Sequence, residues 1–159
     1  SSELMSKSVR LVEAAIAAAG LHCEVAELPA STRTAKEAAA AVGCEVKQIA
    51  KSIVFRGAET DEAILVVASG TNHIDEQLVA QSVGEPLAKA TPDFVRERTG
   101  FAIGGVAPCG HAGKVRVYLD RDLLSLGSLW AAAGTPHAVF NIDAADLERL
   151  TGAQIIDVQ

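Results

Sequence analysis

The run from Gly100 to Pro108 contains the residue types best suited to presenting backbone amides to a ligand. It reads Gly-Phe-Ala-Ile-Gly-Gly-Val-Ala-Pro, with Gly104 and Gly105 adjacent. Glycine has no Cβ to keep a ligand away from the main chain, and proline fixes φ at the bend. Amides held outward in this way can bind a carbonyl oxygen or an oxyanion. An ordinary tight turn is the alternative interpretation of such a pair.

Two further residues could do chemistry beside this loop. Lys51 stands in the apolar segment 49–55, where an ammonium near a small pocket can anchor a phosphate or polarise a carbonyl. His137, in a Thr-Pro-His turn, can hydrogen-bond a substrate or position a water. As an alternative, Lys51 could lie along a strand edge with its ammonium in water. His137 could likewise be a solvated loop histidine.

Several familiar chemistries have no matching motif in this chain. There is no GxxxxGK[ST], no GxGxxG after a strand and no HExxH. The histidines show no metal-ligand spacing, so we expect no metal and no cofactor; they are His22, His73, His111 and His137. Cys109, beside the glycine loop, is the candidate for a thiol nucleophile, with simple packing as its alternative.

Composition restricts the class of protein. The 159 residues are 49% hydrophobic and only 4% aromatic, which predicts a single domain spanning 1–159 with a core and cavity of small aliphatic side chains. A net charge of −6 argues against a broad DNA- or RNA-coating surface. Three cysteines without a CxxC pair favour a reducing cytoplasm, and the charged first segment favours neither a signal peptide nor a membrane span.

The first half of the chain is expected to place Lys51 at the start of a hairpin. A helix is predicted over 3–19, a strand over 21–28, and a second helix over 35–42 that begins at a Thr34/Glu37 capping box and ends at Gly43. After a helical turn at 45–48, segments 49–56 and 63–68 form a β-hairpin. The second of these is apolar throughout, as in a central strand buried on both faces.

The second half is expected to bring polar strand ends and the glycine loop toward that hairpin. A polar break at 69–73 precedes a helix over 74–83 that Asn72 or Thr71 could cap, then a strand over 86–90 and a helix from Pro92 to 98. Strands are predicted over 114–119, 130–133, 138–142 and 154–158, with an ill-defined turn at 123–129 and a helix capped by Asp143 that ends at 150. We therefore predict an α/β fold, a single domain with a mixed, curved β-sheet surrounded by helices.

These motifs together resemble a known family. The order of Lys51 in its strand, the strand ending at Gly70, the loop with Gly104 and Pro108 four positions apart, and the late Gly-Thr-Pro-His turn is similar to that of the YbaK/prolyl-tRNA-synthetase-associated (ProX-like) editing domains. The resemblance covers the chain from its first helix to Leu150. It implies a free-standing trans-editing deacylase, a hydrolase of the ester bond in mischarged proline tRNA.

The resemblance also implies roles for particular residues. Lys51 matches the family's lysine, and Gly104 and Gly105 would supply backbone stabilisation of the oxyanion while water or a ribose hydroxyl attacks the ester. The expected substrate-binding residues lie at strand ends and in the loops: Thr34, Ser52, Ser69, Gly70, Asn72, Val106, Ala107, Pro108 and His137.

The substrate and partners are expectations of the same kind. Ser52 stands where alanine- and cysteine-specific relatives differ, and we rank alanine or 2-aminobutyrate ahead of cysteine or serine. The acceptor end of tRNA could be gripped by Arg33, Lys47, Lys51 and Arg56, helped by a prolyl-tRNA synthetase or an elongation factor. The alternative to an enzyme is a non-catalytic module that binds a small ligand or the tRNA end.

Overall fold

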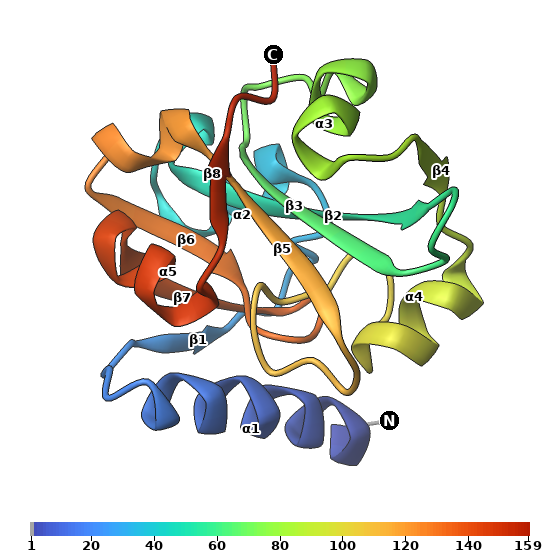
Figure 1. Ribbon diagram of the computed structural model, residues 1–159. Coiled ribbons are helices and arrows are strands. Elements are labelled where there is room, and N and C mark those ends of the chain that lie inside the picture. The colour runs from blue at the N-terminus through green and yellow to red at the C-terminus, as the bar shows by residue number, and fades with distance from the viewer. Residues whose placement is uncertain (1) are drawn as a thin grey trace.

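The computed structural model describes residues 2–159, with side chains from residue 7 onward. Its helices are α1 (Ser2–Ala18), α2 (Ala35–Val42), α3 (Glu76–Val83), α4 (Pro92–Thr99) and α5 (Ala144–Thr151), with short 3-10 turns η1 (Val46–Gln48) and η2 (Arg121–Ser125). Its strands are β1 (Val25–Glu27), β2 (Ile49–Gly57), β3 (Ala63–Ser69), β4 (Leu87–Lys89), β5 (Val115–Asp120), β6 (Ser128–Ala132), β7 (Ala138–Asp143) and β8 (Gln154–Ile156). Figure 1 shows a curved sheet with helices around it.

The strands form one mixed sheet in the order β1-β7-β6-β2-β3-β5-β8, with β4 added to β2. The β2–β3 hairpin is antiparallel, whereas β3 pairs with β5, and β2 with β6, in parallel. β3 is buried along its whole length, as its continuous apolar sequence predicts for a central strand. The predicted α/β fold with a mixed, curved sheet is confirmed.

The core is divided between the two faces of the sheet. On one face, Val12 and Ile16 of α1 and Leu147 of α5 pack with Leu65 and Val67 of β3. On the other face, α3 covers the alternate β3 side chains, and in Figure 1 it lies on the side of the sheet away from α1. Alternation along β3 therefore anchors both layers.

Local caps end most helices where the sequence predicts. Thr34 and Glu37 form the expected capping box of α2, and Thr91 caps α4 ahead of Pro92. Gly43 and Gly100 end these two helices in the left-handed conformation. These boundaries depend only on residues within one turn of the helix end.

Several predicted boundaries are wrong. Helix α3 is capped by Asp75, whose carboxylate accepts from the N–H groups of Gln77 and Leu78, and not by Asn72 or Thr71. Asp143 is the N-cap residue of α5, as predicted, although its side chain makes no capping hydrogen bond. The first strand is shortened to Val25–Glu27 because only those residues find a partner in β7, and the supposed turn at 123–129 contains η2 and the start of β6.

No helix among residues 2–159 is both long and apolar enough to cross a membrane.

Candidate functional site

A cavity of about 630 Å³ lies beside the part of strand β2 that has no paired strand, within residues 2–159, on the edge away from β3. β2 pairs with β6 only at Ile49 and Ala50, and with β4 only from Phe55 to Gly57. The residues between these two pairings, 51–54, all line the cavity. The site is therefore built on a break in the backbone ladder along one edge of β2.

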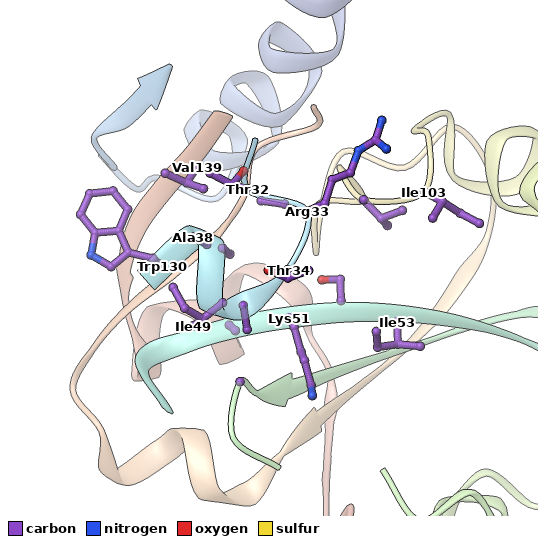
Figure 2. Close-up of a pocket in the computed structure, with 18 of the residues that line it drawn as sticks. Thr32, Arg33, Thr34, Ala38, Ile49, Lys51, Ile53, Ile103, Trp130 and Val139 are labelled. Atoms are coloured by element: carbon purple, nitrogen blue, oxygen red, sulfur yellow. The ribbon is translucent and has the colours of Figure 1, made fainter. Parts of the chain in front are cut away.

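The walls of this cavity are small and mainly apolar. They come from β2, α2, η1, β6, β7, α4 and the glycine loop, and consist of Ala35, Ala38, Val46, Ala50, Val54, Ala90, Val95, Val106, Ala131, Ala132 and Val139. The larger side chains Ile49 and Trp130 lie at one end, and Ile53 and Ile103 at the other (Figure 2). Polar side chains are confined to Thr32, Arg33, Thr34, Lys36, Lys51 and Ser52. Such a lining suits a small aliphatic group attached to a polar one.

Ser52 and Lys51 project from opposite faces of β2, as consecutive strand residues must. Ser52 faces the same layer as Ala50 and Val54, and its Oγ is buried without a hydrogen-bond partner among the described residues. A buried hydroxyl without a partner costs free energy, on the order of 1–3 kcal/mol. This atom is therefore placed to receive a polar group of a ligand.

The Lys51 ammonium is held by the protein. Its Nζ donates to the main-chain carbonyl of Asn72 at 2.8 Å. In Figure 2 the side chain extends from β2 away from Thr34 and Arg33. Lys51 thus borders the cavity with its stem, and its charge lies where β3 ends.

The polar strand end of β3 is tied to a buried carboxylate. Asp120, 1% exposed, accepts from the Ser69 N–H at 3.0 Å and from the Asn72 Nδ2 at 2.8 Å. Asn72 Nδ2 also donates to Asp122, and the Ser69 hydroxyl donates to the Lys47 carbonyl. The side chains of Ser69 and Asn72 are thus occupied inside the protein, and they position the carbonyl that holds Lys51.

Gly70 is required here for space. A Cβ at this residue would collide with the Val46 carbonyl oxygen and lie 2.9 Å from the Ala35 Cβ. Of the three residues predicted at this strand end, only Gly70 lines the cavity. The polar pair beside it is structural support.

The glycine loop lies across the cavity from β2. Gly104 has φ of 90°, a conformation that favours glycine, and the Arg33 side chain packs over it. The Gly105 N–H closes a turn on the Ala102 carbonyl at 3.0 Å, which corrects the expectation that this amide faces a ligand. The amides of Gly104 and Val106 have no protein acceptor among the described residues, so they are the donors that the loop offers.

Gly105 instead fixes the loop against the late turn. A Cβ there would lie 2.6 Å from the Thr135 carbonyl carbon and 2.9 Å from the Pro136 nitrogen. The same turn holds the segment before α2, because Thr32 donates to the Pro136 carbonyl through its N–H at 2.6 Å and its hydroxyl at 2.7 Å. The Gly-Thr-Pro-His turn thus contacts both the glycine loop and the segment before α2, and holds these two walls of the cavity together.

His137 does not line the cavity. Its N–H donates to the Thr135 hydroxyl at 3.2 Å, and its carbonyl accepts from Leu28. Ala107 and Pro108 also lie behind the lining, with Ala107 fully buried.

Among the predicted site residues, the structure brings together Thr34, Lys51, Ser52, Gly70, Gly104 and Val106. The Thr34 hydroxyl is itself engaged with Glu37 in the capping box.

Cys109 has the properties of a packing residue. It is buried, does not line the cavity, and burial raises the pKa of its thiol to about 12. A thiol with that pKa is protonated at neutral pH and is a poor nucleophile. The thiol-hydrolase alternative therefore loses its support.

Two groups that sequence reasoning missed hold the site in place. Asp120 follows an ordinary strand pattern, and nothing local reveals that Ser69 and Asn72 converge on it. His111 donates from Nε2 to the Ala107 carbonyl at 2.8 Å and packs edge-on against Phe101, and burial lowers the pKa of its imidazole. Its position after the glycine loop was the only available signal.

The cations proposed for the tRNA end differ in their surroundings. Lys47 pairs with Glu45, and Arg56 pairs with Asp61. Arg33 and Lys36 are exposed, line the cavity and make no ion pair within residues 7–159. Arg33 is thus the predicted contact best placed at the mouth. No cluster of three His, Cys, Asp or Glu residues suited to a metal occurs in the described part of the chain.

Comparison with known proteins agrees with this architecture. The aminoacyl-tRNA editing domain model matches residues 29–150. A crystal structure of a "putative trans-editing enzyme for prolyl tRNA synthetase" superposes with a TM-score of 0.89 at 53% identity, covering 96% of both chains.

Two curated relatives differ in how much of their own length this chain matches. An uncharacterized protein of Bacillus subtilis, YwhH, is 35% identical over 136 residues, which cover 85% of this chain and 86% of YwhH. The proline–tRNA ligase of Thermosipho melanesiensis is 31% identical over 94 residues, which cover 58% of this chain and 16% of the ligase. Because the editing-domain model matches residues 29–150, YwhH matches over most of both chains, and the solved trans-editing structure shares the fold, the chain belongs to the aminoacyl-tRNA editing domain family (YbaK/ProX).

Proposed function

We propose that this protein is a free-standing trans-editing deacylase that hydrolyses proline tRNA mischarged with a small amino acid. Membership of the editing family implies aminoacyl-tRNA deacylase activity. The observation that carries the finer proposal is the methyl-lined cavity at the β2 break, closed on one side by the glycine loop. It has room for a small side chain and offers backbone donors to an ester.

The lining favours alanine or 2-aminobutyrate as the amino acid. Alanine and valine side chains form most of the walls, and Ser52 supplies a single buried hydroxyl. One methylene changes binding in such a pocket by only about 1–3 kcal/mol. Cysteine and serine are therefore expected as weaker substrates.

Catalysis in this proposal depends on orientation and on stabilising the oxyanion. Water attacks the ester carbonyl carbon, either directly or after a free ribose hydroxyl of the terminal nucleotide has taken over the acyl group as a new ester, and negative charge develops on the carbonyl oxygen. The Gly104 and Val106 amides stabilise that oxygen, and Lys51, whose ammonium is held on the Asn72 carbonyl where β3 ends, adds positive charge at that end of the cavity. The bond between the acyl carbon and the ribose oxygen then breaks, the departing ribose oxygen takes up the proton released by the attacking water, and the free amino acid leaves.

The tRNA is expected to be held weakly. Arg33 and Lys36 lie at the mouth of the cavity, on a chain with a net charge of −6. Two cations can contact few phosphates, so affinity should be modest and should fall as salt is raised. A prolyl-tRNA synthetase or an elongation factor would then contribute to selecting the tRNA.

The test is release of labelled amino acid from proline tRNA charged with alanine, 2-aminobutyrate, cysteine, serine or proline. We expect hydrolysis of alanyl and 2-aminobutyryl tRNA, little of the prolyl form, and a loss of about 100-fold or more in Lys51→Ala. Lys114→Ala is the matched control, because this exposed lysine pairs with Glu62 and does not line the cavity. Hydrolysis of cysteinyl or seryl tRNA alone would overturn the ranking of substrates.

A non-catalytic module that binds a small ligand or the tRNA end is the second candidate. It is favoured by one observation, the hydrogen bond that commits the Lys51 ammonium to the Asn72 carbonyl. A lysine that only supports this strand end would leave turnover unchanged in Lys51→Ala. Absence of hydrolysis with all five charged tRNAs, together with retained binding of the tRNA end, would establish this alternative.

A further inference from the structure

The backbone groups of β2 alternate between its two edges, and their direction can be followed from the hairpin turn. The Gly57 N–H donates to the Glu62 carbonyl, on the β3 side, and the Ala58 N–H donates to the Pro86 carbonyl, on the β4 side. In an antiparallel pair, alternate residues point their N–H and C=O groups to the same edge. The even-numbered residues Ser52 and Val54 therefore direct theirs away from β3.

No strand among the described residues meets Ser52 on that edge. The β6 ladder ends at the pair Ala50–Ala131, and the β4 ladder ends at Phe55–Lys89. At about 3.3 Å per residue, the four positions between these ends span roughly 13 Å. Ala132 and Ala90 flank the gap and line the cavity.

This gap differs from an ordinary sheet edge because both of its ends are closed. A peptide strand cannot extend along it, whereas one residue fits between the two ladders. The buried Ser52 Oγ, which lacks a protein partner, lies at the same position and adds a further polar atom to it. The spacing and the polar groups select a ligand of the size of a single amino acid.

We propose that the aminoacyl group of the substrate binds to Ser52 as a one-residue strand, an inference that rests on the proposed function. Its α-ammonium donates to the Ser52 carbonyl, and its ester carbonyl accepts from the Ser52 N–H, as in a hydrogen-bonded antiparallel pair. The second lone pair of that ester oxygen is left for the glycine-loop amides, whose bonds strengthen as negative charge develops. The bond from the α-ammonium is the stronger of the two, because its donor carries a charge. The side chain then lies on the same face as Ser52, between Val54 and the other apolar walls.

This arrangement also opposes proline. The proline ring fixes the rotation about N–Cα and leaves the nitrogen with one N–H fewer than a primary ammonium. A primary ammonium can rotate to aim a hydrogen at the Ser52 carbonyl, whereas a ring nitrogen cannot. Prolyl tRNA would thus escape hydrolysis because its nitrogen cannot make this hydrogen bond, in addition to any misfit of the proline ring in the cavity.

The decisive experiment removes the ammonium from the substrate. Wild-type protein is given proline tRNA carrying an alanyl, a lactyl or a propionyl group, which have the same carbon skeleton and offer respectively an ammonium, a hydroxyl and no donor. Each kcat/KM is divided by the rate of hydrolysis without protein, because the ammonium also activates the free ester. We expect the corrected value to fall about 10- to 100-fold from alanyl to propionyl, with lactyl between them.

A variant of the protein tests the other bond. Ser52→Pro removes an N–H that no strand uses, and proline is tolerated at such an edge position. We expect circular dichroism to show a folded protein whose kcat/KM for alanyl tRNA is reduced about 10-fold or more. If this variant does not fold, the acyl series decides by itself.

The outcomes separate the two proposals. Equal corrected rates for the alanyl and propionyl groups, or full activity in a folded Ser52→Pro protein, overturn the strand-edge mode and leave the deacylase function intact. Failure of the wild-type protein to hydrolyse any alanyl tRNA overturns both. A graded loss from alanyl through lactyl to propionyl supports the mode.

Discussion

Strand β2 is bordered by two polar clusters that are built in opposite ways. Near the hairpin turn, the buried Glu85 carboxylate accepts from the N–H groups of Glu59 and Thr60, from the Thr60 hydroxyl and from Arg116. Every one of these distances lies between 2.8 and 3.0 Å. The hydrogen bonds, that to the Thr60 backbone first among them, lower the pKa of Glu85 to about 2.

In the cavity, which lies a few residues away along the same strand, several polar groups have no hydrogen-bond partner among the described residues. The Ser52 Oγ has no partner, the Ser52 backbone has no strand beside it, and two amides of the glycine loop find no acceptor within the described chain. Buried polar groups in proteins are normally satisfied. The first cluster therefore stabilises the fold, whereas the second leaves donors and acceptors free for the proposed ligand.

Glu85→Gln should give the largest loss of stability among these substitutions and leave activity intact at temperatures where the protein is folded. Its pKa is lowered in the folded state, so its contribution to the free energy of unfolding is present above its ordinary pKa of 4.5 and is lost as the pH falls through about 2. Thermal unfolding across this range, with kcat/KM at neutral pH, measures both effects.

Asp61→Asn is the control for Glu85→Gln, because it alters an exposed carboxylate in the same turn, paired with Arg56 and Arg98. It should change the melting temperature little. Loss of activity in folded Glu85→Gln would contradict the separation of the two clusters.

Asp120→Asn should lower both stability and activity, because this carboxylate supports the strand end that holds Lys51. Both carboxylate oxygens of Asp120 accept hydrogen bonds, one from the Ser69 N–H and the Asn72 Nδ2 and the other from the Asp122 N–H. The NH2 group of an asparagine would therefore face a donor in either orientation, at a cost of about 1–3 kcal/mol in the free energy of unfolding. Displacement of the Asn72 carbonyl should reduce kcat/KM about 10- to 100-fold. Denaturant unfolding and deacylation assays provide the two readings.

The same change at Asp157, an exposed partner of Arg121, is the control and should affect neither. If Asp120→Asn lowers stability alone, Lys51 does not depend on this support.

Gly104→Ala and Gly84→Ala form a matched pair that separates backbone strain from function. Their φ values are 90° and 92°, so both alanines should cost about 1–2 kcal/mol in the free energy of unfolding. A Cβ at Gly84 meets nothing within 4 Å, whereas one at Gly104 lies 2.9 Å from the Arg33 Cγ, at the mouth of the cavity. Only Gly104→Ala should reduce kcat/KM, and equal activities would remove the loop from the site.

His111→Gln should give the smallest effect, seen in the pH dependence of stability. Burial lowers the pKa of His111 in the folded protein, so the wild type loses unfolding free energy as the pH falls below 6.5. Glutamine can still donate to the Ala107 carbonyl but does not titrate. Denaturant unfolding between pH 6.5 and about pH 5 should show a flatter profile in the variant, and parallel profiles would assign the acid sensitivity to other groups.

Much of the fold could be predicted because its signals are local. The Thr34/Glu37 capping box, the glycine ends of α2 and α4 and the apolar run of β3 each depend on residues a few positions apart. The cap of α3 was misassigned because Thr71, Asn72 and Asp75 are all suitable residue types. Only the path of the chain decides which of them stands at the first turn.

The site was predicted less completely. The positions of Lys51, Ser52 and Gly104 around one cavity agree with the sequence interpretation. The polar side chains of Ser69 and Asn72 are used by the protein itself, and the backbone groups of His137 bond to Thr135 and Leu28 while the residue lies outside the cavity lining. Residue type indicates that a group can bind a ligand, and only its neighbours determine whether it is free.

The sequence by itself determined the ends of α2 and α4, the central strand and the residues that β2 presents, because short-range hydrogen bonds and periodicity are encoded within a few positions. Tertiary structure alone decided where β6 and β4 stop along β2, that Asn72 holds Lys51, and that Gly105 packs on Thr135. These contacts join segments that lie about 20 to 80 positions apart, and their pairing is set by how the layers pack together.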